Sequence, residues 1–141
     1  MISFVVYGTP APQGSKRFVG TSKAGRGILV ESSRKVLPWR EAVKHAALQV
    51  RPSEPLDGPL SVTMTFTLAR PASAPKRRRW PDRMPDLSKL VRSTEDAITD
   101  AGLWTDDARI VSCLASKVYV GGSGDALASP GVRVEVLPWQ T

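Results

Sequence analysis

The 141-residue sequence predicts a single α/β (α+β) domain with the element order β-α-β-α-β-β. Three observations lead to this fold class. The composition is typical of a globular protein, with 41% hydrophobic and 23% charged residues. Apolar residues recur with a period of two in some segments and with helical spacing in others, which indicates strands and helices in one chain. The length is close to the commonest size of one domain, so we expect residues 1–141 to form one.

The first part of the chain predicts a strand, a long loop and a helix. Residues 2–7 are mostly β-branched or aromatic and end at Gly8, which is typical of a strand. Residues 9–30 carry prolines, glycines and basic side chains, so we expect a long basic loop; loops of this length are usually functional or disordered. From about residue 38 to residue 50 the apolar residues stand at helical spacing.

The second part predicts three strands and the clearest helix. Residues 60–68 alternate between apolar and polar side chains, which indicates a half-buried strand. Residues 70–85 are a second basic loop, rich in proline. Residues 87–101 gather their apolar side chains on one arc of a helical wheel, with Asp86 suited to the N-cap and Gly102 to the residue after the helix. The remaining strands are expected at residues 109–120 and 132–137.

Charge is distributed unevenly along the chain, whose net charge is +7. Residues 1–79 hold fourteen basic and four acidic residues, whereas residues 80–141 hold six basic and nine acidic residues. Seven of these acids fall within residues 82–107. A basic surface beside a group of carboxylates suits a metal-dependent phosphodiesterase, because cations attract the DNA backbone and carboxylates hold the Mg²⁺ that activates water. The alternative is that the acids form a solvated helix face and a turn.

The cysteine and histidine content excludes several other kinds of site. The chain has one cysteine, Cys113, and one histidine, His45. It therefore has no internal disulfide, no zinc site built from several cysteines and no metal centre with several histidines, which fits a reducing compartment. The N-terminus lacks the pattern of a signal peptide, and no segment approaches the ~20 apolar residues of a membrane-spanning helix. We expect a cytoplasmic protein with no membrane partner.

The segment 85–107 combines several short motifs in one order. They are Asp86, Lys89 and Leu90 at the start of the helix, Asp96-Ala97-Ile98 within it, and Gly102-Leu103-Trp104 and Asp106-Asp107 after it. This pattern resembles the signature of the RusA-type Holliday-junction resolvases, which are small endodeoxyribonucleases of bacteria and their phages. The opening segment, residues 8–16, also resembles the N-terminal segment of phage members. The likeness spans most of the chain and agrees in element order.

The resemblance implies a homodimer with a small mixed sheet and two helices, dependent on Mg²⁺ (with Mn²⁺ as a substitute). It also implies that Asp86 and Asp107 bind the metal and that Arg92 is needed for activity. Asp106 is a second candidate ligand, or else the residue that forms the turn. Sparse ligation is chemically adequate, because Mg²⁺ needs only one or two protein carboxylates. A dimer suits a four-way junction, because two-fold symmetry places two nicking sites on it.

One position departs from the family pattern. The family carries a second aspartate where this chain has Ser88, which is a weaker and neutral ligand. Glu95 lies on the same stripe of the predicted helix, ~10 Å further along its axis. We therefore expect Glu95 to supply the missing carboxylate. The alternatives are that Glu95 pairs with Arg92, three residues before it, or that the protein has lost catalysis.

Basic residues of both loops are candidate DNA contacts, because a nuclease-like group of acids follows them in the sequence. The candidates are Lys16, Arg17, Lys76, Arg77, Arg78, Arg79 and Lys89. Trp80 is a candidate for stacking on bases, whereas Trp104 follows an amphipathic helix and is expected in the core.

The sequence therefore predicts a Mg²⁺-dependent endodeoxyribonuclease that resolves branched DNA by paired symmetric nicks, using metal-activated water. The alternative is a catalytically impaired protein that binds four-way junctions, because Ser88 weakens the metal site. A third possibility is a basic structural or RNA-binding protein without an active site, which the gathering of seven acids disfavours.

Overall fold

The computed structural model describes residues 1–14, 16–21, 27–31, 34–122 and 124–140. For residues 16–21 and 27–31 it describes the backbone alone. The strands are β1 (Ile2–Tyr7), β2 (Lys16–Thr21), β3 (Gly27–Glu31), β4 (Leu60–Leu68), β5 (Ile110–Tyr119) and β6 (Gly131–Pro138). The helices are α1 (Val36–Val50), α2 (Leu87–Ala101) and the 3-10 helix η1 (Asp107–Arg109). The chain is a small mixed α+β domain, as predicted.

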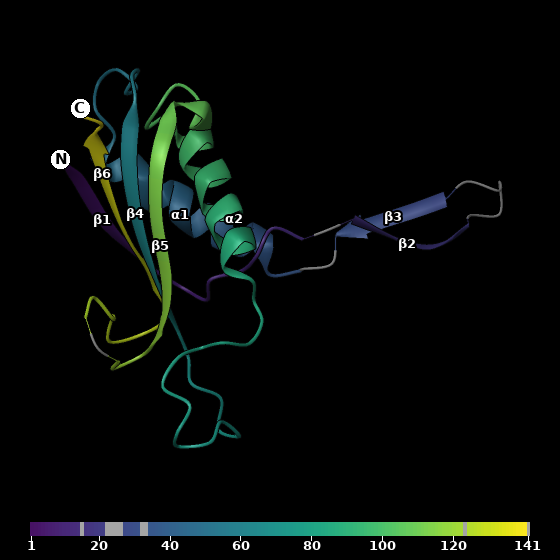
Figure 1. Ribbon diagram of the computed structural model, residues 1–141. Coiled ribbons are helices and arrows are strands. Elements are labelled where there is room, and N and C mark those ends of the chain that lie inside the picture. The colour runs from purple at the N-terminus through teal and green to yellow at the C-terminus, as the bar shows by residue number, and fades with distance from the viewer. Residues whose placement is uncertain (15, 22–26, 32–33, 123, 141) are drawn as a thin grey trace.

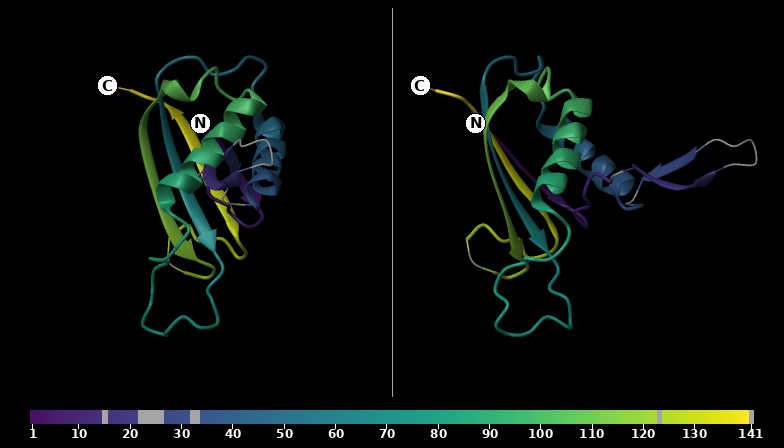
Figure 2. Two further views of the ribbon diagram at one scale, coloured as in Figure 1. Left: turned by 90° about the vertical axis from the view of Figure 1, so that its right-hand side faces the viewer. Right: turned by 45° about the vertical axis from the view of Figure 1, so that its right-hand side comes forward.

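Four strands form one sheet in the order β1-β6-β4-β5. β4 and β5 are parallel, while β6 is antiparallel to both β1 and β4. The parallel pair follows from the connection, because α2 carries the chain from the end of β4 back to the start of β5. Both α1 and α2 cover the same face of the sheet, so the opposite face has no helix on it (Figures 1 and 2).

The core lies between this sheet and the two helices. The alternation in β4 places Leu60, Val62, Met64 and Phe66 against the helices, as predicted. The strand is half-buried only in its first part, because Thr65 and Thr67 on its other face are buried as well. α1 contributes Trp39 and Val43, and α2 contributes Leu90 and Ile98. Trp104 is 1% exposed and donates its indole N–H to Thr99, so its predicted place in the core is confirmed. Neither helix is of a length and hydropathy that could cross a membrane, within the residues that the structure describes.

The predicted loop at residues 9–30 is partly wrong, because β2 and β3 pair within it as an antiparallel hairpin. The hairpin is a separate two-stranded sheet that extends away from the body of the molecule (Figure 1). Glycines and prolines dominate the composition of this stretch and hide two short β-forming runs, around Phe18 and around Leu29. Pairing between them depends on contacts across the turn, which local composition does not reveal.

The other boundaries agree with the sequence to within one or two residues, apart from η1. α1 begins at Val36, two residues earlier than expected, since Pro38 is tolerated in a first helical turn. The strand expected at residues 109–120 begins at Ile110, because η1 occupies the residues before it. Gly102 follows α2 with φ +78°, a left-handed conformation that favours glycine.

The N-terminal segment after β1 packs along α2 and buries more of that helix than the wheel predicts. Ser93 lies on the polar side of the wheel, yet it is fully buried. Its hydroxyl donates a hydrogen bond of 2.7 Å to the carbonyl of Ala11, and the N–H of Gln13 donates to the carbonyl of Lys89. The segment around Ala11 is thereby held against the first half of α2.

Replacing Ser93 with alanine should lower the free energy of unfolding by about 1–2 kcal/mol, because the buried carbonyl of Ala11 loses its donor. Urea unfolding monitored by tryptophan fluorescence would measure the change. Ser129→Ala, the same substitution at an exposed position, is the matched control and should change the free energy by less than about 0.5 kcal/mol. Equal effects of the two substitutions would contradict the role of the Ser93 hydrogen bond.

Candidate active site

The N-terminus of α2 leaves the carboxylate of Asp86 available to a ligand. Asp86 occupies the predicted N-cap position, but its side chain makes no capping hydrogen bond. The carboxylate instead lies 4.0 Å from the ammonium of Lys89, and its side chain is 57% exposed. Because neither partner is buried, this ion pair is weak and an incoming cation or phosphate can replace it.

A group of carboxylates gathers beside the second half of α2. Burial, and then the charges of Asp107 and Asp96, raise the pKa of the half-buried Glu95. Burial, and then the charge of Glu95, raises the pKa of the Cys113 thiol. Because Cys113 is on β5, the carboxylate of Glu95 lies near this strand. A charged carboxylate raises the pKa of another carboxyl only when the two lie close together and solvent screens them poorly. Glu95, Asp96 and Asp107 therefore form a concentration of negative charge, which we call the α2–η1 carboxylate group.

Asp106 and Asp107 take different roles within the connection to β5. The Asp106 carboxylate accepts the N–H of Ala108 at 2.8 Å and so caps η1, which is consistent with the turn-forming role, one of the two roles that the sequence left open. This bond and a side-chain hydrogen bond with Asp107 lower the pKa of Asp106. The same hydrogen bond is the largest cause of a raised pKa at Asp107, followed by desolvation. Asp107 is consequently the member of the pair that gains most from a nearby positive charge.

Arg92 supplies positive charge to this group from one turn earlier in α2. Its charge lowers the pKa of both Glu95 and Asp107, against the larger effects that raise them. No direct ion pair between Arg92 and Glu95 exists among the described residues, so simple pairing of the two is not what places Glu95 here. The exposed guanidinium remains free to bind a phosphate.

Asp86 lies apart from the α2–η1 carboxylate group within one chain. It precedes one end of α2, whereas η1 begins beyond the other end (Figure 1). The step of nine positions from Asp86 to Glu95 corresponds to about 13 Å along a helix axis. Accordingly, no set of three or more His, Cys, Asp or Glu side chains is arranged to hold a metal ion within the described part of the chain.

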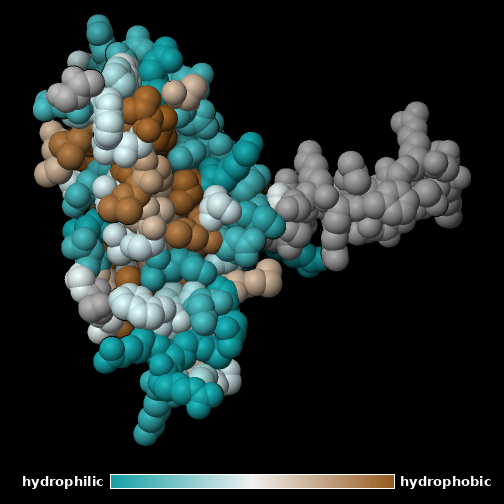
Figure 3. Space-filling view, viewed as in Figure 1, coloured by the Kyte–Doolittle hydropathy of each residue, from teal (hydrophilic) through white to brown (hydrophobic). Residues whose placement is uncertain are grey.

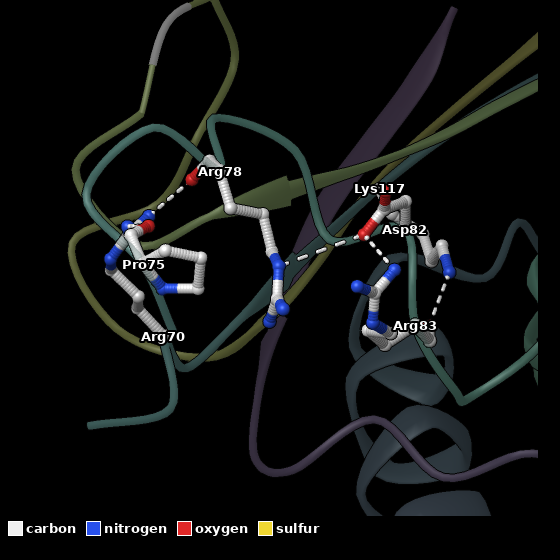
Figure 4. Close-up of polar contacts among 6 residues, drawn as sticks. All are labelled: Arg70, Pro75, Arg78, Asp82, Arg83 and Lys117. Carbon is white, nitrogen blue, oxygen red and sulfur yellow. Dashed lines mark hydrogen bonds and ion pairs between the residues drawn. The ribbon is translucent and has the colours of Figure 1, made fainter. Parts of the chain in front are cut away.

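The loop that leads into Asp86 is tied to the sheet by a lysine that the sequence analysis did not select. Lys117 on β5 donates hydrogen bonds of 2.9 Å to the carbonyls of Arg83 and Pro85 (Figure 4). Asp82 bridges Arg78 and Arg83, at 3.8 Å and 3.0 Å. These contacts fix the entry to α2. A lysine within a strand carries no sequence signal for such a role, because its partners are backbone carbonyls distant in sequence.

A cavity of about 390 Å³ opens beside Asp86. Its walls come from the N-terminal segment, the start of α1 and the start of α2, and three cations line it: Arg34, Lys35 and Lys89. Gln13 also lines it, and its side-chain amide oxygen is buried with no hydrogen-bond partner among the residues that the structure describes. Arg34 and Lys35 were missed by the sequence analysis. Their adjacency just before a helix was the available signal, but only the fold brings them to Asp86.

The predicted DNA contacts fall in three different regions. Lys76, Arg77, Arg78 and Arg79 lie in the loop between β4 and α2, which extends from the lower end of the sheet in Figure 1. Lys89 lies beside Asp86. Lys16 and Arg17 are on β2, where their side chains lie outside the described residues. Trp80 is 55% exposed in the same loop as Lys76.

Within the α2–η1 carboxylate group, Glu95 and Asp107 offer two carboxylates of the kind that a hard divalent cation takes as ligands, although the three members together are not arranged as a metal site in the described part of the chain. Carboxylate oxygens are the ligands that Mg²⁺ and Mn²⁺ prefer, and Mg²⁺ keeps several waters beside one or two protein ligands. Burial raises the pKa of Glu95 most, and the charge of Asp107 raises it further, so ionised Glu95 is disfavoured beside ionised Asp107. A bound cation would remove that repulsion.

Two comparisons with known proteins bear on this site. The family model described as "Endodeoxyribonuclease RusA" matches residues 8–136, which include both helices, β4, β5 and most of β6, while β1 lies outside the match. A search of curated proteins finds no match. The matched region contains Asp86, the α2–η1 carboxylate group and the basic loop between β4 and α2.

Proposed function

We propose a reaction on the premise that the chain belongs to the RusA endodeoxyribonuclease family, whose members are hydrolases with Holliday-junction resolvase activity. Enzymes of this family are generally dependent on a divalent metal, and their substrate is branched DNA. The finer proposal is that this chain cuts four-way junctions by paired symmetric nicks with Mg²⁺. The observation that carries it is the convergence of Glu95 and Asp107 beside Arg92.

Each residue of the site has a distinct part in this proposal. Asp107 and Glu95 would hold a Mg²⁺ or Mn²⁺, which supplies an activated water and stabilises charge on the phosphate. Arg92 binds a non-bridging oxygen of the scissile phosphate and stabilises its developing charge. Asp106 keeps η1 in place through its cap, so that Asp107 points toward α2. Lys89, with the neighbouring Arg34 and Lys35, binds the DNA backbone beside the site.

A second copy of the chain gives Asp86 a place in the same chemistry. Within one chain, Asp86 is about 13 Å along α2 from the carboxylate group. In a two-fold dimer, Asp86 of one copy can lie against the carboxylate group of the other, and the two sites then face the two strands of a junction. A mixture of inactive Asp86→Asn and Asp107→Asn subunits should then regain about a quarter of wild-type activity, from heterodimers with one intact site. A mixture as inactive as its components would contradict a shared site.

The exposed edge of the sheet at β5, beside the α2–η1 carboxylate group, is the surface we propose for the dimer. Leu114 is 70% exposed on β5 and pairs in register with Thr63, so it lies on the side away from the helices. Val111 on the same edge strand is 55% exposed, and apolar side chains gather over this part of the molecule (Figure 3). An exposed apolar patch with no cover from the chain's own helices is typical of an interface.

Leu114→Lys should convert the dimer to a monomer, because a charge placed in the apolar patch would lose its hydration on association. Sedimentation equilibrium would measure the mass. Leu48→Lys, at a 44% exposed position on α1, is the matched control and should leave the dimer intact. The assignment of the interface is wrong if Leu114→Lys remains dimeric.

The function is tested by cleavage of a labelled four-way junction against a linear duplex of matched sequence, in tenfold steps of Mg²⁺. Nicks at symmetric positions near the crossover, found in the junction and not in the duplex, support the proposal. Tight junction binding with no nicks in either Mg²⁺ or Mn²⁺ supports the alternative, a binding protein whose metal site is impaired by Ser88. Equal affinity for junction and duplex without cleavage would exclude both.

A further inference from the structure

A cavity of about 510 Å³ lies at the far end of β5, away from Asp107. It is formed between the loop that follows β4 and the turn that follows β5. Its volume falls within the range of about 300–1,000 Å³ that small-molecule sites occupy. The residues that line it and matter here are Arg70, Lys76, Arg78, Arg79, Trp80 and Tyr119. The cavity thus combines four cations with two aromatic rings.

Two of these cations are engaged in holding the cavity in shape. The guanidinium of Arg70 lies 5.2 Å from the ring centroid of Tyr119 and donates a hydrogen bond of 2.6 Å to the carbonyl of Arg78 (Figure 4). Arg70 also donates to the carbonyl of Pro75. Arg78 forms an ion pair with Asp82 at 3.8 Å. The loop is therefore folded back on itself around Arg70.

The remaining cations and the exposed aromatic ring are available to a ligand. Lys76 and Arg79 form no ion pair within the described part of the chain. Trp80 is 55% exposed, whereas Tyr119 is buried beneath Arg70. Gly121 and Gly122 form the opposite wall, so no side chain fills the space there. The cavity offers two phosphate-binding groups beside one flat apolar ring.

We propose that this cavity binds one unpaired nucleotide of the DNA substrate, with its base stacked on Trp80 and its phosphate bound by Lys76 and Arg79. The proposal rests on the proposed action on branched DNA and names the feature of the DNA that is recognised. In a continuous duplex both faces of each base are covered by neighbouring bases. A base can lie flat against Trp80 only where the stack is interrupted, at a branch point or a bulge. Stacking accepts any base, because every base presents a π face.

The basic run itself contains the matched control. Arg77 stands between Lys76 and Arg79 and is equally exposed to solvent, but it does not line the cavity. If the run acts only as a diffuse positive charge, Arg77→Gln and Arg79→Gln should have the same effect on every DNA. If the cavity binds a nucleotide, only Arg79→Gln should affect the preference for unpaired DNA, whereas Arg77→Gln should weaken all DNAs alike.

The test measures the affinity of the full chain, without divalent metal, for a linear duplex and for the same duplex with one bulged thymidine. The dissociation constant of the plain duplex divided by that of the bulged duplex reports the preference for an unpaired nucleotide. Trp80→Ala should reduce this ratio by about 5- to 100-fold, the range expected for one lost base–aromatic stack. Trp80→Phe should retain most of it. Trp139→Ala, at a 45% exposed tryptophan outside the cavity, should leave it unchanged.

Each outcome decides the proposal. A wild-type ratio near one, or a ratio that Trp80→Ala leaves unchanged, overturns it, as does an equal effect of Arg77→Gln and Arg79→Gln on the ratio. Junction cleavage that persists alongside any of these results leaves the nuclease function standing and removes only the nucleotide cavity. A bulge preference that depends on Trp80, in a protein that does not cut junctions, supports the cavity and removes the proposed reaction.

Discussion

Asp107→Asn should lower the rate of junction cleavage by about 10³-fold while leaving junction affinity unchanged or slightly higher. The amide keeps the shape of the side chain but removes the negative charge that the site offers to a cation. Affinity should not fall, because the change makes a DNA-binding surface less negative. Single-turnover cleavage of a labelled four-way junction at saturating Mg²⁺, with binding measured in EDTA, separates the two effects.

The control for this substitution is Asp125→Asn, which makes the same chemical change at an exposed aspartate in the turn between β5 and β6. Its cleavage rate should match that of the wild-type chain. If Asp107→Asn cuts junctions at the wild-type rate, Asp107 holds no essential metal. If it loses binding as well as cleavage, its carboxylate has a structural role in η1.

Glu95→Gln should lower Mg²⁺-dependent cleavage by about 10²-fold, a smaller effect than that of Asp107→Asn because Asp107 remains as a ligand. The expectation follows from the position of Glu95 beside Asp107 and from the absence of a carboxylate at Ser88. The measurement is the cleavage rate as a function of Mg²⁺ concentration. The loss should be partly recovered at high Mg²⁺, because a weakened site fills at a higher concentration. Full activity of Glu95→Gln at low Mg²⁺ would disprove the compensation.

Ser88→Asp in the Glu95→Gln background provides the complementary test. If Glu95 replaces the family's second aspartate, the double variant should cleave at least about tenfold faster than Glu95→Gln alone. A double-mutant cycle measures this coupling between the two positions. Without metal, the midpoint temperature of thermal unfolding should be no lower for Glu95→Gln than for the wild-type chain, because the substitution removes a charge from a crowded carboxylate group. Additive effects of the two substitutions would show that the two positions serve different purposes.

Most of the fold follows from local sequence patterns. β4 and α2 were predicted with their observed boundaries, because each has a strong periodicity and clear residues at its ends. The β2–β3 hairpin was not predicted, since its stability comes from pairing between two short segments in a glycine-rich stretch. The burial of Ser93 was likewise invisible, because the segment that covers it is distant in sequence.

The composition of the site was easier to predict than its arrangement. Helical spacing placed Glu95 and Arg92 on one side of α2, and the structure brings Asp107 to them. The sequence analysis assigned Asp86, Asp107 and Glu95 to one metal site, although helix geometry sets Asp86 and Glu95 about 13 Å apart along the axis. The direction in which η1 returns depends on the tertiary fold. The contributions of Arg34, Lys35 and Lys117 depend on segments that meet only in the folded chain.

The loop between β4 and α2 is anchored at both ends in rigid elements, with Lys117 holding its exit. The entropic cost of lengthening such a loop grows slowly, by about 0.6 kcal/mol for each doubling. Residues 69–85 can therefore be lengthened, shortened or exchanged without moving Glu95 or Asp107. Descendants of one ancestral chain can diversify in which DNA shapes they engage while inheriting the same hydrolytic machinery, and a designer can graft this loop between relatives for the same reason.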